Sequence, residues 1–285
     1  MRYPIGLQSF DHLREEGYVY VDKTAMVYSL AHGSTVYFLG RPRRFGKSLL
    51  ISTFENYFLG KKELFKGLAI EKLETEWKTY PVFHIDFGTG SYANADALNQ
   101  IFEFYISGWE KKYRIEREPG VTDYNLRFKK ILEEAHQQTG LRAVVLVDEY
   151  DKPLLDNISH SGAALEMREG LRNLYSVLKG SDEHLQFVFM TGVSKFSKVS
   201  LFSGLNNLID ITLDPRYSAL CGYTDADVDT VFAPELPGLD REEIRRRYNG
   251  YNWQGTSVYN PFELLQLFLH REFKPYWFEA STPTM

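Results

Sequence analysis

The sequence is short of cysteine, of long apolar runs and of clustered histidines. Cys221 is its single cysteine, which excludes an internal disulfide framework and is typical of a reducing compartment. No stretch of 18 apolar residues exists, and the opening MRYPIGLQSFDHL lacks the apolar core of a signal peptide. The seven histidines show no metal-ligand spacing. We therefore expect a cytoplasmic protein with no membrane segment.

An excess of positive charge is also missing. The chain has 33 basic and 38 acidic residues and a formal net charge of −5, so the molecule as a whole is not suited to electrostatic binding of nucleic acid. Such binding would need a local basic patch. Apolar residues (44%) and charged residues (25%) are in an ordinary globular balance, and 285 residues suffice for one large domain or two modest ones.

What the sequence does contain is an alternation of short apolar runs with longer amphipathic segments. This order predicts a mostly parallel five-stranded sheet with helices on both faces, an α/β fold that binds ligands at the carboxyl ends of its strands. The expected strands are residues 35–39, 81–87, 143–147, 185–192 and 208–213, and the main expected helices are 47–58, 94–115, 123–138 and 163–179.

Beyond about residue 216 the pattern becomes helical. Asn260, Pro261 and Glu263 form a helix-start signal, because asparagine caps well, proline suits the first helical position and glutamate the third. We therefore divide the chain into a core with an N-terminal extension (1–215) and a small helical subdomain (216–285). A winged-helix-like arrangement is one option for the subdomain.

The segment GRPRRFGKS, after the first predicted strand, carries the second half of a phosphate-binding loop. Such a loop needs a lysine for the β- and γ-phosphates, a hydroxyl for Mg²⁺, and a helix start whose backbone N–H groups face the anion. Gly46, Lys47 and Ser48 meet these needs directly before an apolar helix. The first half departs from the pattern, because Arg41 stands where a glycine is expected and Gly40 lies one residue earlier. A basic turn capped by Ser48 is the alternative, and the flanking strand and helix favour the phosphate loop.

Two carboxylates, Asp148 and Glu149, follow the third predicted strand in AVVLVDEYDKP. A phosphoryl-transfer site uses one acidic side chain at a strand end to hold Mg²⁺, and often a second one to orient the attacking water. Asp148 and Glu149 fit these two roles in order. The alternative is that Asp148 and Asp151 only cap the following turn. The phosphate loop earlier in the chain favours the catalytic interpretation.

Other polar residues also follow predicted strands. Thr191 and Ser194 are candidates to contact the γ-phosphate or its water, and Lys195 and Lys198 could add positive charge. A solvated polar loop explains them equally well. Asp86, after the second strand, is a weaker candidate for the same sheet edge.

The arginines of the sequence allow two interpretations. Arg41, Arg43 and Arg44 could surround a triphosphate, one of them as a charge-stabilising finger, or at least one could be solvated or structural. Residues 245–247, also arginines, could contact nucleic acid. Because glutamates precede them at positions 242 and 243, an ordinary exposed helix face is the simpler interpretation.

The motifs YPIGLQSF, YVDKT, RPRRFGKS, VLVDEYDKP and YNPFELL together resemble the AAA-ATPase-like group of bacterial P-loop ATPases, over essentially the whole chain. The resemblance implies that Gly46, Lys47 and Ser48 bind nucleotide and that Asp148 and Glu149 supply the metal and water carboxylates. The resemblance also implies that an arginine in place of the first glycine of the loop is usual in this family. Members often continue into a C-terminal nuclease-like domain of the PD-(D/E)xK type, which is absent here. A natural short form and a fragment both remain open.

The sequence thus predicts an ATPase that hydrolyses Mg·ATP, with catalytic residues Lys47, Asp148 and Glu149 and with Mg²⁺ held by Ser48 and Asp148. An unknown protein partner and an oligomer are compatible with it. The alternatives are a nucleotide-dependent interaction or scaffold module with negligible hydrolysis, and a nucleic-acid-binding module. The predicted nucleotide-binding residues are Gly40, Arg41, Arg43, Arg44, Phe45, Gly46, Lys47, Ser48, Leu49 and Thr191.

Overall fold

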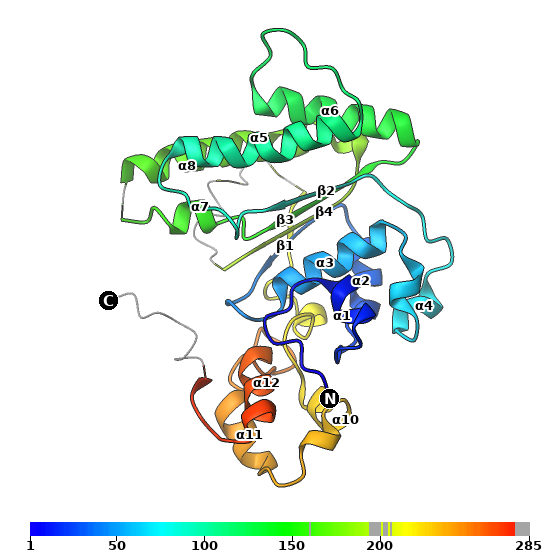
Figure 1. The fold of residues 1–285 in the computed structure, drawn as a ribbon, viewed down its shortest axis with the longest axis vertical. Coiled ribbons are helices and arrows are strands. Elements are labelled where there is room, and N and C mark those ends of the chain that lie inside the picture. The colour runs from blue at the N-terminus through cyan, green and yellow to red at the C-terminus, as the bar shows by residue number, and fades with distance from the viewer. Residues whose placement is uncertain (160, 194–200, 202–204, 206, 277–285) are drawn as a thin grey trace.

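The computed structural model, shown in Figure 1, describes residues 1–159, 161–193, 201, 205 and 207–276. Its centre is a five-stranded sheet of order β2-β3-β4-β1-β5 in which every pairing is parallel, as the sequence predicts. The last strand is only two residues long, shorter than predicted. The strands are β1 (Val36–Gly40), β2 (Val82–Asp86), β3 (Ala143–Asp148), β4 (Leu185–Gly192) and β5 (Ile209–Asp210).

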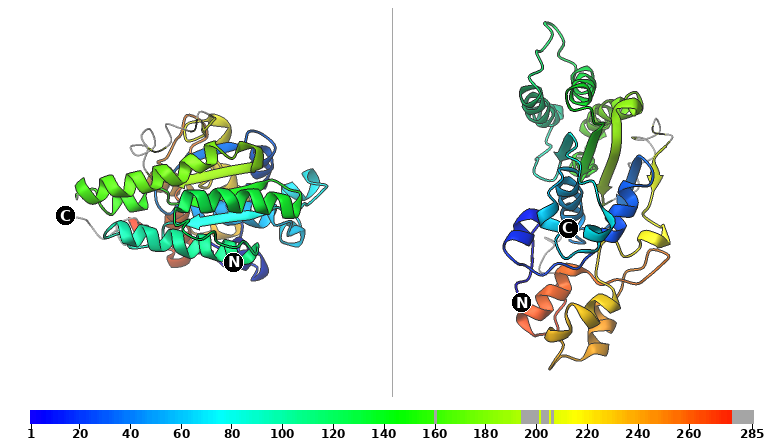
Figure 2. Two further views of the ribbon diagram at one scale, coloured as in Figure 1. Left: turned by 90° about the horizontal axis from the view of Figure 1, so that it is seen from above. Right: turned by 90° about the vertical axis from the view of Figure 1, so that its right-hand side faces the viewer.

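Helices cover both faces of this sheet (Figures 1 and 2). On one face α5 (Ala95–Lys112), α6 (Tyr124–Thr139) and α8 (Ser161–Lys179) lie side by side. These helices and α3 confirm the helices that the sequence predicts for the core. The shortest helices were not predicted, because they have too few turns to show the 3.6-residue repeat of apolar side chains. The other face holds α1 (Phe10–Glu15), α2 (Thr24–Ala31), α3 (Lys47–Phe58) and α4 (Ala69–Leu73), and α7 (Lys152–Leu155) follows β3.

The central strands are buried on both faces, which explains their continuous apolar runs. In β1, Val36 and Phe38 pack into the core under α5, α6 and α8, whereas Tyr37 and Leu39 pack into the core under α3. None of the helices within the described ranges has both the length and the apolar character that crossing a membrane requires.

The carboxyl ends of the strands meet at one edge of the sheet. Asp86 at the end of β2 is in register with Asp148 at the end of β3, and Gly40 of β1 is in register with Gly192 of β4. The loops that follow these strands are therefore neighbours, and this edge is where the sequence places the ligand site.

The C-terminal part contains the α-helices α10 (Asp225–Thr230), α11 (Arg241–Tyr248) and α12 (Pro261–His270), joined by irregular segments. Asn260 caps α12 as predicted, since its side chain accepts hydrogen bonds from two N–H groups of the first turn. These helices share a separate core, and Tyr3, Ile5 and Val21 of the N-terminal extension pack into it. The extension therefore joins the sheet domain to the C-terminal part.

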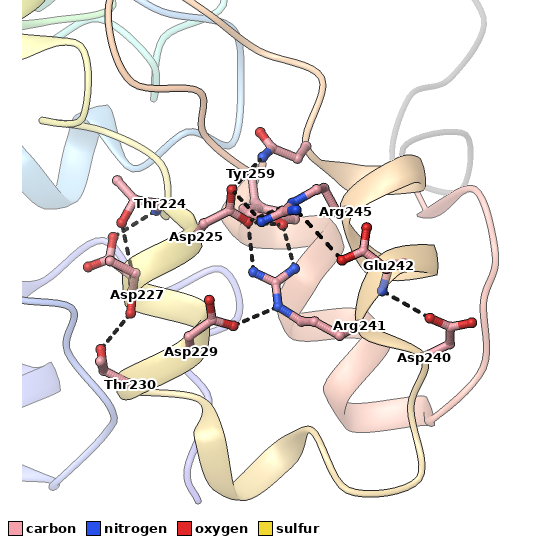
Figure 3. Close-up of polar contacts among 12 residues, drawn as sticks. Thr224, Asp225, Asp227, Asp229, Thr230, Asp240, Arg241, Glu242, Arg245 and Tyr259 are labelled. Atoms are coloured by element: carbon pink, nitrogen blue, oxygen red, sulfur yellow. Dashed lines mark hydrogen bonds and ion pairs between the residues drawn. The ribbon is translucent and has the colours of Figure 1, made fainter.

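An ion-pair network holds the C-terminal helices together (Figure 3). Asp225 accepts hydrogen bonds from Arg241 at 2.7 Å and from the Tyr259 hydroxyl at 2.6 Å, and Arg245 also pairs with Asp225. The next two arginines, residues 246 and 247, both pair with Glu243. This part of α11 is consequently charge-balanced, which weakens the nucleic-acid alternative built on its three arginines.

Candidate functional site

The start of α3 has no side-chain cap, in contrast to α5, α6, α11 and α12, which asparagine or aspartate side chains cap. Its N-cap residue is Gly46, whose φ of 86° lies in the left-handed region that favours glycine. Among the described residues, no acceptor receives a hydrogen bond from the backbone N–H groups of Gly46, Lys47, Ser48 or Leu49. Free donors at the positive end of a helix suit an anionic phosphate.

Lys47 lies almost entirely inside the protein, with 4% of its surface exposed. Its Nζ donates a hydrogen bond to the Pro42 carbonyl oxygen at 3.0 Å, so the ammonium group folds back over its own loop. Burial lowers the pKa of Lys47, and the negative charge of Asp148 opposes this shift. Because an ammonium group has three donors, two remain for phosphate oxygens.

Asp148 ends β3 and is buried. Its Oδ1 accepts hydrogen bonds from the Thr191 hydroxyl and, at 3.0 Å, from the Glu149 backbone N–H. Thr191 is fully buried, and its hydroxyl positions Asp148. The contact of Thr191 with nucleotide stays a prediction. Asp151 is structural, because its buried carboxylate accepts the Val193 N–H at 3.0 Å and ties this loop to β4.

Glu149 has a strained backbone, with a φ of 51° that residues other than glycine rarely adopt. Such strain costs about 1–3 kcal/mol and is concentrated at functional sites. Burial raises the pKa of the Glu149 carboxyl, the nearby charge of Asp148 adds to this rise, and the positive charge of Lys47 opposes it. A raised pKa brings a carboxylate closer to the range in which it works as a base near neutral pH.

A pocket of about 430 Å³ lies beside the phosphate loop and is bounded by the N-terminal extension, by α3 with its loop, and by the C-terminal part. Of the predicted site, residues 43–49 and Glu149 line it, whereas Gly40, Arg41, Asp148 and Thr191 do not. The walls contributed by the two outer segments are mostly apolar, and our sequence reasoning missed them although family motifs lie in both segments. They include Ile5, Leu7, Val19, Tyr20, Cys221, Tyr223, Phe262 and Leu265.

The Arg41 side chain is buried among backbone carbonyl oxygens. It is 1% exposed and donates hydrogen bonds to the carbonyl oxygens of Gly40 (2.9 Å), Thr212 (2.8 Å) and Tyr217 (3.3 Å). The guanidinium also lies 4.0 Å from the ring centroid of Trp253. The Arg41 side chain does not line the pocket, and its predicted contact with nucleotide stays a prediction.

The other two loop arginines have different surroundings. Arg44 adopts a φ of 65°, and its guanidinium lies 4.2 Å from the ring centroid of Phe262 in α12. Arg43 is exposed and lines the pocket, and its positive charge lowers the pKa of Glu149. No ion pair within the described residues joins Arg43 to a carboxylate. Arg43 is therefore the loop arginine best placed to meet a phosphate.

The contrast between these arginines predicts different effects on stability. We expect Arg41→Ala to lower the free energy of unfolding by about 3 kcal/mol, because several buried carbonyl oxygens lose their donor. The matched variant Arg43→Ala should change it by less than about 0.5 kcal/mol, because the side chain is exposed. Urea unfolding of both variants measures this difference. Equal stability of the two variants contradicts the structural role of Arg41.

Phe45 connects the phosphate loop to the C-terminal part. Its buried ring makes edge-to-face contacts with Tyr251, at a centroid distance of 4.6 Å, and with Trp253, at 5.3 Å. Together with the position of Arg44 over Phe262, this contact makes the shape of the loop depend on the segment beyond residue 216.

The described residues contain no group of three or more His, Cys, Asp and Glu side chains that could hold a metal ion. The predicted Mg²⁺ site is of another kind, since Ser48 and Asp148 would supply two ligands and phosphates and water the others. The predicted candidates Ser194, Lys195 and Lys198 lie outside the described residues.

A parallel α/β sheet, a lysine-bearing loop that leads from β1 into an uncapped helix, and an acidic pair at the end of β3 define a domain of the P-loop NTPase type. Residues 4–202 match the family model described as "Predicted AAA-ATPase", and the chain belongs to this family. It is 54% identical, over 285 residues, to the "Uncharacterized protein in vnfD 5'region" of Azotobacter chroococcum mcd 1. The aligned region covers 99% of this chain and 54% of that protein, so the chain spans about half the length of this relative.

Proposed function

We propose that the chain binds Mg·ATP in this pocket and hydrolyses it to ADP and phosphate. One observation carries the proposal: the uncapped start of α3, the Lys47 side chain and Glu149 all line a single pocket of about 430 Å³. That volume lies within the range of about 300–1,000 Å³ typical of small-molecule sites. The family to which the chain belongs, that of predicted AAA-ATPases, supports the same activity.

The phosphates would lie against the start of α3. The backbone N–H groups of residues 46–49, the Lys47 ammonium and the Arg43 guanidinium would bind their oxygens. Mg²⁺, when bound, would be held by Ser48 and Asp148 and would neutralise part of the phosphate charge. The nucleoside would fit the mostly apolar end of the pocket between the N-terminal extension and α12.

Glu149 would act on the attacking water. As the water oxygen forms its bond to the γ-phosphorus, the bond from that phosphorus to the β–γ bridging oxygen breaks, and the water proton passes to the Glu149 carboxylate. The pKa of Glu149, raised by burial, favours this role.

A second candidate is a nucleotide-dependent switch with negligible hydrolysis. The contacts of Phe45 and Arg44 with the C-terminal part favour it, because a nucleotide that reshapes the loop would also act on that part. The nucleotide state would then pass to a protein partner or a further domain.

Phosphate release from ATP distinguishes these functions. We expect the wild type to release phosphate with Mg²⁺ present, to stop when EDTA replaces Mg²⁺, and to respond little to added DNA. Tight ATP binding without phosphate release would support the switch instead. A rate that DNA raises, with DNA binding that falls steeply with salt, would support the nucleic-acid alternative.

Arg43 provides a test of where the phosphates lie. We expect Arg43→Ala to weaken ATP binding by about tenfold, because one charge-assisted contact to phosphate is lost. Arg246→Ala is the matched control, since that arginine pairs with Glu243 in α11. Equal ATP affinity of the two variants contradicts a phosphate contact by Arg43. The measurement is a titration with a fluorescent ATP analogue.

A further inference from the structure

The turn after β2 packs directly against the side chain of Glu149. A Cβ atom added to Gly88 would lie 3.0 Å from Glu149 Oε2 and 2.9 Å from Asp86 Oδ1, both closer than ordinary van der Waals contact. Gly88 does not have a positive φ, so its backbone conformation does not require glycine. What requires glycine at this position is the space that the two carboxylates occupy.

Asp86 fixes the conformation of this turn. Its Oδ1 accepts the Gly88 N–H at 2.7 Å, and its backbone N–H donates to the Tyr105 hydroxyl at 3.0 Å. The next N–H, of Phe87, donates to the carbonyl oxygen of Asp148 at 3.1 Å. The turn is therefore tied to α5 on one side and to the end of β3 on the other, next to Glu149.

The Glu149 carboxylate has little else to hold it. Its backbone is anchored, because its N–H donates to Asp148 Oδ1 and its carbonyl oxygen accepts the Lys152 N–H at 2.9 Å. Among the described residues, however, no donor or cation makes a hydrogen bond or ion pair with its side-chain oxygens. Its direction is thus set by the strained backbone and by contact with Gly88.

We propose that Asp86 and Gly88 are positioning residues of the ATPase site. Asp86 holds the turn, and Gly88 forms the surface against which the Glu149 carboxylate rests as it faces the pocket. This inference rests on the proposed function, since it concerns how Glu149 is placed for the attack of water. Neither residue lines the pocket, so neither is expected to contribute to nucleotide affinity.

Gly88→Ala tests the role of the space. The added methyl group would displace the carboxylates of Asp86 and Glu149. Misplacement of a reacting group by about 1 Å can lower a rate by about 100-fold. We expect kcat for phosphate release to fall about 10- to 100-fold, with the dissociation constant of a fluorescent ATP analogue unchanged within about twofold. The matched control is Gly108→Ala in α5, where an added Cβ meets nothing within 4 Å. Its kcat should equal that of the wild type.

Asp86 variants test the role of the turn without adding volume. Asn retains an oxygen that can accept the Gly88 N–H, so Asp86→Asn should keep most of the kcat that Asp86→Ala loses. Thermal unfolding of all variants shows whether each is folded. If Gly88→Ala is unstable, the comparison of kcat between Asp86→Ala and Asp86→Asn still tests the positioning role, and equal kcat values of these two folded variants overturn it.

The outcomes separate the two levels of the account. A wild type that releases phosphate, together with a folded Gly88→Ala variant of unchanged kcat, overturns the positioning role and leaves the ATPase activity intact. A folded Gly88→Ala variant that loses nucleotide affinity in step with kcat overturns it as well. A wild type that binds ATP and releases no phosphate contradicts the proposed hydrolysis itself, and the inference with it.

Discussion

Replacing Lys47 by alanine is expected to weaken ATP binding by about 100-fold or more. The variant loses a buried ammonium group of the pocket wall and up to two charge-assisted hydrogen bonds to phosphate oxygens. The low exposure of Lys47 makes the loss larger, because water does not screen a buried charge as it screens one at the surface. Equilibrium titration with a fluorescent ATP analogue measures the change.

The control for this variant is Lys129→Ala. Lys129 lies in α6 on the far side of the sheet, and its exposed ammonium makes a long i,i+4 pair with Glu133. We expect this variant to bind ATP like the wild type. Unfolding experiments on Lys47→Ala establish that it is folded. If folded Lys47→Ala binds ATP with wild-type affinity, the assignment of the phosphate loop is wrong.

The second large effect is expected for Glu149→Gln, which should lower the rate of phosphate release by about a thousandfold while ATP binding stays within a fewfold of the wild type. Glutamine has nearly the same volume, so it fits against Gly88, but its amide cannot accept the proton of the attacking water. Glu116→Gln is the matched control, since Glu116 is exposed and does not line the pocket. Simultaneous loss of binding and turnover in Glu149→Gln would indicate a structural role.

The pH dependence of turnover gives a further test of Glu149. A general base works only when deprotonated, so the rate should fall as the pH drops through its pKa. Burial and the charge of Asp148 raise this pKa above the ordinary value of 4.5, and we expect the acid limb of the profile above that pH. The residual activity of Glu149→Gln should lack the limb. A limb that persists in this variant would assign it to another group.

Much of the fold is predictable because the signals are local. The runs at 35–39 and 143–147 are apolar throughout, as strands buried on both faces must be, and their bounds agree with β1 and β3 within one residue. The run at 208–213 predicts a longer strand than β5. The difference has a local cause, because the Gly40 N–H bonds to the hydroxyl of Thr212 and not to a backbone carbonyl of this segment.

The candidate site is only partly predictable for a different reason. Lys47, Ser48 and Glu149 belong to contiguous motifs, so their proximity follows from the order of the strands. The apolar wall of the pocket comes from two segments that lie about 200 residues apart in sequence, and no periodic pattern shows that they meet. The role of Gly88 could not be predicted either, because it depends on the Glu149 side chain, which belongs to the loop after the neighbouring strand β3.

The loop arginines show how far charge patterns alone can lead. From the sequence GRPRRFGKS alone, Arg41, Arg43 and Arg44 are equivalent candidates for phosphate binding. In the fold, Arg41 bonds to carbonyl oxygens and lies over Trp253. Arg43 and Arg44 are both exposed and both line the pocket, but the Arg44 guanidinium lies over Phe262. These roles depend on carbonyl oxygens and aromatic rings of the segment beyond residue 211. The sequence of the loop alone does not indicate where those groups lie.

A crystal structure with Mg²⁺ and a non-hydrolysable ATP analogue tests the central claim most directly. The account predicts the triphosphate at the N–H groups of residues 46–49, with Lys47 and Arg43 turned toward it, Arg41 still over Trp253, and Glu149 beside the γ-phosphate. Binding of the analogue elsewhere, or its phosphates held by Arg41 while Lys47 stays bonded to Pro42, would contradict the account.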